Sequence, residues 1–506
     1  MVATVPKQRV QLSGLSRQGA LRAIALRRSS SLERRRARVR ARFDSAATTA
    51  DNRRHWANAD GLSADSAAST DVRRILRNRA RYEVANNSYA RGIVLTLAND
   101  TIGTGPRLQM LTGADALNRD VEREFDLWAT EVSLAEKLRT MRMARCQDGE
   151  AFAILVNNPG VGHPVKLDLR LTEADMVTSP WGNLFNPQGG VCTQTPEVDG
   201  IRLDQYGNPT LYRVMKEHPG GSAWSLLDDF DDVPAPSMIH VFRQERPGQH
   251  RGIPEITPAL PLFAQLRRFT LAVLAAAEAA ADFAGILYTD APANGEAEQV
   301  EPMDSIELER NMLMTMPGGW KMSQIEPMQP ATTYAEFKKE ILNEIARCLN
   351  MPFNVAAGNS SGYNYASGRL DHQVYYKSIR IDQDFMAAKV LDRILSAWLW
   401  EYALATGVLF EGATGPLPNH QWFWDGQEHV DPAKEANAQE TRLKSNTTTL
   451  AREYARQGLD WESELRQRSK EKALMRELGL QDVTDMPAPA GKAGDGAGNN
   501  SDSGGG

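Results

Sequence analysis

Apolar residues recur every three or four positions along most of this chain, and this is the period of an amphipathic helix. The segments with this period predict helices at 72–103, 116–145, 258–287, 333–349, 370–405, 432–444 and 461–478. The first helix is expected to end at Gly103 and Gly105, because glycine commonly terminates helices. The helix at 370–405 has an apolar side formed by Phe385, Val390, Leu391, Ile394, Leu395 and Trp398. The pattern indicates a mainly helical protein.

Short apolar runs typical of strands occur in the first half of the chain. They predict strands at 152–156, 167–171 and 239–242, separated by Gly- and Pro-rich turns such as 219–221. The second half offers helices and no comparable set of strands. We therefore expect an α+β fold, mainly helical.

Residues 258–352 are predicted to leave the main body of the protein and return to it, and we call this segment the excursion. An Ala-rich helix is followed by short, turn-bounded elements, and a second helix returns. The insert between the helices is acidic, with Glu296, Glu298 and Glu301 close together. Alanine lets helices approach closely, so the first helix suits packing against copies of itself. An ordinary core helix would have the same composition, and both interpretations stay open.

The segment 351–368 carries no charged side chain, although it lies between two strongly predicted helices. A long polar loop held in this way is usually functional. It contains Gly358-Asn-Ser-Ser-Gly362, which fits the GxSxG pattern of a hydrolase nucleophile, and Asp371 or Asp425 with His429 could complete a triad. That motif requires a strand, a sharp turn and a helix in a parallel sheet. Residues 353–357 could be the strand, but the helical second half offers no such sheet, so a serine hydrolase using Ser360 is the weaker alternative.

Composition and charge exclude several other classes. The 506 residues carry a net charge of −6, but residues 1–54 hold fourteen Lys and Arg against three acids, as in a disordered tail or a nucleic-acid or assembly contact. Three widely spaced cysteines argue against a disulfide framework. The longest apolar run, 271–287, contains Glu278 and Asp282, so no membrane span is expected.

Motifs for nucleotide and metal chemistry are missing from the sequence. No P-loop pattern occurs, and Gly491-Lys492 lies in a low-complexity tail at 487–506 that we expect to be disordered. No metal-binding motif occurs, and His429 is interpreted as a capping or surface group. The aromatic run 422–426 could stack on bases, but a packed corner is the preferred interpretation. We expect no enzyme activity, no cofactor and no metal.

Four stretches, taken together, resemble the lambda family of phage portal proteins. They span about residues 75–478 and are NSYARGI from Asn87 with NDTIG from Asn99; IHVF from Ile239 with Gly248 and RGIPE from Arg251; Phe337, ILNEIA from Ile341 and MPF from Met351 with GYNYASGR from Gly362; and WDG from Trp424 with HVDP from His429 and KEA from Lys434. The basic arm and the Gly-rich tail lie outside this resemblance.

The resemblance implies a dodecameric ring at one capsid vertex, with an axial channel for double-stranded DNA that is bound without sequence preference. It implies a separate terminase motor, contacts with the major capsid or scaffold protein and with head-completion and tail proteins, and no membrane. The protein would be located in the virion at the portal vertex, and in the host cytoplasm during assembly.

The same resemblance divides the chain into the parts of a portal. The expected parts are a basic arm 1–54, wing 55–257, stem helix 258–290, clip 291–330, returning stem helix 331–352, tunnel loop 353–369, wing support helix 370–412, crown 413–486 and tail 487–506. Channel-lining candidates are Asn359, Ser360, Ser361, Gly362, Tyr363, Asn364 and Tyr365. Docking candidates for terminase or an adaptor protein are Glu296, Glu298 and Glu301.

Overall fold

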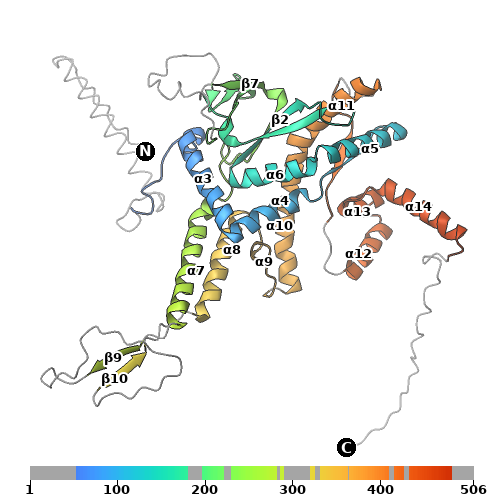
Figure 1. Ribbon diagram of the computed structural model, residues 1–506. Helices are drawn as coiled ribbons and strands as arrows, with labels where there is room; N and C mark the ends of the chain where they lie inside the picture. The colour runs from blue at the N-terminus through green and yellow to red at the C-terminus, as the bar shows by residue number, and fades with distance from the viewer. Residues whose placement is uncertain are drawn as a thin grey trace, which may run out of the picture. The chain divides into compact units, whose positions relative to one another are not determined.

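The computed structural model describes residues 53–179, 197–221, 229–281, 285–289, 320–324, 331–362, 364–408, 415–426 and 432–480 (Figure 1). The chain separates into a unit at Met1–Ser63 and a larger unit at Ala64–Gly506. Every element described below belongs to the larger unit.

Helices make up most of the described chain. They are α2 (Ala64–Ala67), α3 (Thr70–Asn86), α4 (Ser88–Ile102), α5 (Asp115–Glu131), α6 (Leu134–Gln147), α7 (Leu260–Ala281), α8 (Ala331–Cys348), α9 (Phe353–Ala357), α10 (Tyr365–Met386), α11 (Asp392–Thr406), α12 (Pro432–Lys444), α13 (Leu450–Arg456) and α14 (Trp461–Glu477). A mainly helical fold is confirmed.

Two helices that the sequence predicts as continuous are each broken in two. Asn87 separates α3 from α4, because its side-chain oxygen accepts hydrogen bonds from the amides of Tyr89 (3.0 Å) and Ala90 (3.3 Å) and so starts a new helix. Ser133 separates α5 from α6 with a left-handed backbone (φ 53°). The helical spacing of apolar residues in the sequence continues through both breaks, so the prediction of one helix at each place was wrong.

The long helix predicted at 370–405 is confirmed as α10 and α11, joined by a π-helical segment at Ala387–Leu391. Its predicted apolar side is also confirmed. Val390, Leu391, Ile394, Leu395 and Trp398 are fully buried, and Phe385 is partly buried beside them.

The described strands form small antiparallel sheets. They are β1 (Arg107–Met110) with β11 (His420–Phe423); β3 (Leu167–Thr172), β2 (Glu150–Asn157) and β8 (Met238–Phe242) in that order; β4 (Glu197–Val198), β5 (Ile201–Leu203), β6 (Pro209–Met215) and β7 (Phe230–Pro234) in that order; and β9 (Gly285–Thr289) with β10 (Trp320–Gln324). The three predicted strands are confirmed as β2, β3 and β8.

Three apolar clusters hold these elements together. One lies between the β2 sheet, α5, α6 and α11, and includes Phe125, Trp128 and Trp398. A second joins the β2 and β6 sheets through Phe152 and Tyr212. The third joins α4, α7, α8, α9 and α10. The long helix α10–α11 therefore contributes to two of the three cores.

The predicted excursion is confirmed in its backbone path. Helix α7 leads to β9, β10 pairs with β9 from Gly285↔Gln324 to Trp320↔Thr289, and α8 returns. Residues 285–287, predicted as the end of the Ala-rich helix, are strand instead. The acidic candidates Glu296, Glu298 and Glu301 lie outside the described residues.

The aromatic run 422–426 forms a packed corner, as the sequence indicates. Strand β11 pairs with β1 across more than three hundred residues of sequence, and Phe423 is buried. The Trp422 indole donates to Asp392 (2.9 Å), and Thr104 donates to Asp425 through its amide and its hydroxyl. These contacts join the corner to α11 and to the end of α4, and they favour a packed corner over stacking on bases.

Candidate functional site

The polar loop singled out in the sequence is shorter in the structure than its composition suggests. Residues 353–357 form the one-turn helix α9, not a strand, and α9 ends at Gly358 in a left-handed conformation (φ 62°). Helix α10 already begins at Tyr365. The connecting loop is therefore 358–364, with Tyr363 outside the described residues.

Asn354 of α9 holds this loop in place. Its carbonyl accepts a hydrogen bond from the Asn359 amide (3.0 Å), and its side-chain Nδ2 lies 3.0 Å from His372 Nε2 and 3.5 Å from the Ser360 hydroxyl. The Asn359 side chain accepts from the Ser361 amide (2.9 Å), which closes a local turn. Asn354 is buried, while Asn359, Ser360, Ser361 and Gly362 are exposed. The structure thus presents a short neutral polar surface on a fixed base.

The geometry gives no support to a hydrolase at Ser360. The preceding element is a helix, so the strand that a nucleophile elbow requires is absent at this position. Within the described residues, the Ser360 hydroxyl has Asn354 as its hydrogen-bond neighbour and no histidine or carboxylate. The Asp425 carboxylate accepts hydrogen bonds from the amide and the hydroxyl of Thr104, and His429 lies outside the described residues. No general base reaches Ser360 in the described chain.

Helix α10, which leads away from the loop, is held by polar contacts to α4. The Tyr375 hydroxyl donates to Asp100 (2.7 Å), and Gln383 Nε2 donates to the Thr101 carbonyl (3.1 Å). Burial raises the pKa of Asp100 and of Tyr375 above their usual values. The base of the loop is therefore fixed to the core over several turns.

A buried charge cluster fixes α10 to the start of α7. We call it the Glu255 cluster; it contains Glu255, Arg142, Arg145 and Asp382. Arg142 donates to Glu255 (2.9 Å) and Asp382 (2.8 Å), and Arg145 donates to Glu255 (2.8 Å) and Asp382 (3.0 Å). Burial would raise the pKa of Glu255, but Arg142 and Arg145 outweigh it and lower the pKa to about 2. The carboxylate is thus ionised at neutral pH and links three segments.

Comparisons with known proteins assign this fold to a family. Residues 50–383 match the family described as phage portal protein, lambda family. The chain belongs to this family. It is 24% identical over 448 residues to the probable portal protein of Halomonas phage phiHAP-1, covering 83% of this chain and 82% of the relative. It is 22% identical over 478 residues to the portal protein of Escherichia phage N15, covering 84% and 89%.

Solved structures with a related chain trace include parts of gene transfer agent particles. The neck of an empty particle contains a chain 15% identical, with a TM-score of 0.42 over 74% of this chain and 91% of that chain. The virion of a native particle contains one 14% identical, with a TM-score of 0.40 over 76% and 92%. At such TM-scores the assignment to the lambda portal family rests on the sequence matches.

One of the stretches that resemble the portal family also builds a second charge cluster. We call it the Glu150 cluster; it contains Glu150, Arg251, His240, Asp199, Arg73 and Arg77. Arg251 donates to both oxygens of Glu150 (2.6–3.1 Å) and to the carbonyl of Val177 (2.9 Å), and Glu150 is 3.1 Å from His240 Nε2. Burial would raise the pKa of Glu150, but Arg251 and His240 lower it well below the usual value.

One short segment, 248–255, leads into α7 and contributes Arg251 to the Glu150 cluster and Glu255 to the Glu255 cluster. Gly252 packs directly against the backbone of Gly149, where a Cβ atom would collide with the Gly149 carbonyl. Sequence reasoning assigned no role to these residues. The available signals were the Arg251-Gly-Ile-Pro-Glu255 motif and arginines repeated on one helix face, Arg73 with Arg77 and Arg142 with Arg145. In this portal family member they hold the segment that leads into α7 against α6 and β2.

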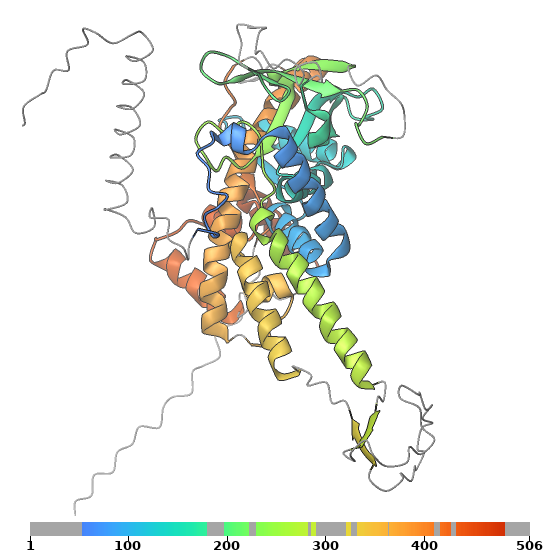
Figure 2. The same cartoon turned by 90° about the vertical axis from the view of Figure 1, so that its left-hand side faces the viewer.

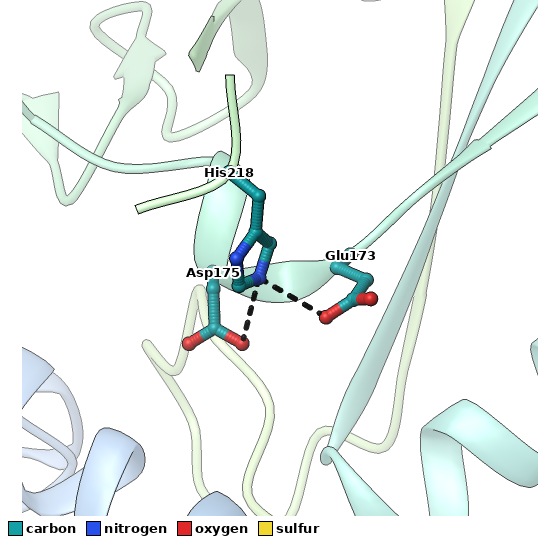
Figure 3. A group of neighbouring side chains, drawn as sticks. All are labelled: Glu173, Asp175 and His218. Atoms are coloured by element: carbon teal, nitrogen blue, oxygen red, sulfur yellow. Dashed lines mark ion pairs between the residues drawn. The ribbon is translucent and has the colours of Figure 1, made fainter. Parts of the chain in front are cut away.

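One group of side chains has the spacing of a metal site. Glu173, Asp175 and His218 bring their ligand atoms within 4.8 Å of one another, and His218 Nε2 lies 3.2 Å from Glu173 and 4.0 Å from Asp175 (Figure 3). Arg77 (2.5 Å) and Arg81 (2.9 Å) already neutralise Asp175, and Arg81 also contacts Glu173 (3.2 Å). A divalent cation would have to displace these guanidinium groups, so we assign no metal to the group.

Proposed function

We propose that the chain assembles as a ring of twelve copies at one capsid vertex and conducts double-stranded DNA through its axis. The observation that carries the proposal is membership of the lambda portal family over residues 50–383. The paired helices α7 and α8 with the β9–β10 ribbon between them add support, because such an arm suits a tubular assembly of several copies.

The parts of the portal are assigned to the chain as follows. We assign the wing to 55–257, the stem to 258–290 and 331–352, the clip to 291–330, the tunnel loop to 353–369, the wing support helix to 370–412 and the crown to 413–486. In this assignment the Glu255 cluster joins the wing to the support helix, three residues before the stem begins. A load on the stem would therefore reach the loop through rigid elements.

The tunnel loop is proposed to touch DNA weakly. Asn359, Ser360, Ser361 and Asn364 are exposed and neutral, and Gly362 adds no side chain. Each phosphate that a cation neutralises releases counterions and adds salt-dependent affinity, which would resist sliding. A neutral polar loop keeps the DNA centred without holding it. Tyr363 and Tyr365 are kept as candidates for the same surface.

The motor and the attachment proteins are assigned to other chains. We assign ATP hydrolysis to a terminase partner, and the missing P-loop pattern in this sequence supports that assignment. Glu296, Glu298 and Glu301 are proposed as part of the docking rim for terminase or a head-completion protein. Reversing their charge should block DNA packaging and leave ring assembly intact. Unchanged packaging would remove this assignment.

Two experiments test the proposed function. Light scattering on the purified protein should give a mass near 670 kDa, which is about twelve times 55.9 kDa. A stable monomer would refute the ring. Replacing Asn359 with Lys should slow DNA packaging and steepen its dependence on salt, because it adds a phosphate contact, whereas Ser360→Ala should package as the wild type does. Equal packaging by the lysine variant would remove the loop from the channel wall.

A further inference from the structure

Helix α7 is apolar but largely uncovered. In the described part of the chain, Thr257–Glu278 is the helix that is long and apolar enough to cross a membrane, yet only 22% of its most apolar window is buried. Its first half packs into the core through Leu260, Phe263 and Leu266. Beyond Arg267, Leu271 is 60% exposed and Leu274 is 55% exposed. We therefore asked which molecule would cover these exposed apolar side chains of α7.

A bilayer does not fit as the occupant. The buried first half of α7 is fixed in the protein, and Arg267 pairs with Glu83 of α3 (3.4 Å). About fourteen residues remain, which at about 1.5 Å per residue span about 21 Å, while a hydrocarbon core is about 30 Å thick. Arg268 and Glu278 also lie within the free part. The surface is too short and too charged to cross a membrane.

The free face of α7 has the spacing of a helix-pairing seam. Arg268, Leu271, Ala275 and Glu278 follow one another at steps of three and four, so they lie on one side of the helix, and Arg268 and Leu271 are exposed. Within the described residues Arg268 has no ion-pair partner in its own chain. A partner for this face therefore needs an acidic group beside an apolar or small surface.

Helix α8 carries the complementary charge. Its outward row is Glu336, Glu340, Asn343 and Arg347, also at steps of three and four, and Glu336 and Glu340 are exposed. Neither glutamate has an ion-pair partner among the described residues of its own chain. Phe269 faces α8, and at about 100° per residue Leu271 and Ala275 are turned to the far side of α7. The free face of α7 therefore points away from α8 of its own protomer.

The relative height of the two helices selects the residues that would meet. Figures 1 and 2 show α7 and α8 side by side, and Phe269 contacts Tyr334 (5.6 Å between ring centres) and Phe337 (4.5 Å). Arg268 therefore lies near the level of Phe337. Side chains lean toward the N-terminus of their helix, so Arg268 leans toward the core end of α7 while Glu340 leans the opposite way along the antiparallel α8. The two side chains converge in height.

We propose that the free face of α7 docks on the outward row of α8 of a second copy of this chain, with Arg268 paired to Glu340 of that copy. This rests on the proposed ring, because rotation about an axis along the helices brings a neighbour's α8 to the height of the protomer's own. The contact is heterologous, so each protomer gives its α7 face to one neighbour and its α8 row to the other.

Charge reversal tests this pairing. Arg268→Glu and Glu340→Arg should each raise the protein concentration needed for half-assembly by at least about tenfold, because each places like charges together. The double variant should assemble as the wild type does. An equimolar mixture of the two single variants should also assemble, because alternating protomers restore an opposite-charge pair at every interface. Arg468→Glu, which reverses an exposed arginine of α14, is the matched control and should assemble normally.

The outcomes separate this inference from the proposed function. Wild-type protein that stays monomeric in light scattering overturns the ring. A wild-type ring with normal assembly of both single variants overturns the Arg268–Glu340 pairing and leaves the ring standing. Sedimentation of the wild type with phosphatidylcholine vesicles, lost in Leu271→Ser, would show that a bilayer covers α7 and would also overturn the pairing.

Discussion

Replacing Glu255 with Gln tests how the entry to α7 is held. The change keeps the shape of the side chain but leaves Arg142 and Arg145 buried, with Asp382 as their remaining acid. Removing one partner of a buried ion pair typically costs about 3–5 kcal/mol. The pKa gives an independent figure, since 4.5 for an ordinary glutamate against about 2 for Glu255 corresponds to about 3 kcal/mol. We therefore expect the free energy of unfolding to fall by about 3 kcal/mol.

Urea unfolding followed by tryptophan fluorescence measures this loss, on samples of equal oligomeric state. Glu217→Gln removes an exposed carboxylate and should change the free energy of unfolding by less than about 0.5 kcal/mol. Because the folded state lowers the pKa of Glu255, its contribution is present above pH 4.5 and disappears as the pH falls toward 2. The wild type and Glu255→Gln should therefore converge in acid. A loss at pH 7 no larger than that of the control would refute the reasoning.

Three further changes test other parts of the structure. Burial and the acids Asp460 and Glu462 raise the pKa of Glu122 to about 7. The wild type should therefore lose on the order of 1–2 kcal/mol of stability as the pH rises from 4.5 to 7, and Glu122→Gln should not; parallel pH dependences of stability in the two proteins would contradict this. Trp398 is fully buried, so Trp398→Ala should cost about 3–5 kcal/mol in urea unfolding, and a cost below about 1 kcal/mol would show that the core can close over it. Asn354→Ala removes the side-chain contacts to Ser360 and His372 but keeps the backbone carbonyl that accepts from Asn359, so it should leave the fold intact and speed amide hydrogen exchange in 360–362; unchanged exchange would show that the backbone contacts alone hold the loop.

Much of the fold follows from periodicity alone. The apolar side of α10–α11 is predictable because every fourth residue is large and apolar from Met386 through Val390 and Ile394 to Trp398. The strands β2 and β3 are predictable because their apolar runs are short and bounded by turns. The breaks at Asn87 and Ser133 are harder, since one residue with a special conformation interrupts a pattern that continues on both sides. Helix α13 was missed because its seven residues are too short to show a period.

The charged junctions could not be predicted from the sequence. An arginine on a helix is normally assigned to the solvent side, yet the side chains of Arg77, Arg142, Arg145 and Arg251 are 1–5% exposed. Their burial depends on acids at least fifty residues away, and single-sequence patterns contain no information on such pairing. The loop predicted at 353–369 is shorter at both ends in the structure, because 353–357 forms α9 and α10 already begins at Tyr365. The one-turn helix could not be predicted, since 353–357 is equally consistent with a short strand.

An image of the purified assembly viewed along its axis tests the central claim most directly. We predict a closed ring of twelve subunits around an open channel, with the α7–α8 arms around that channel. A monomer or an open, non-closing chain of subunits would contradict it.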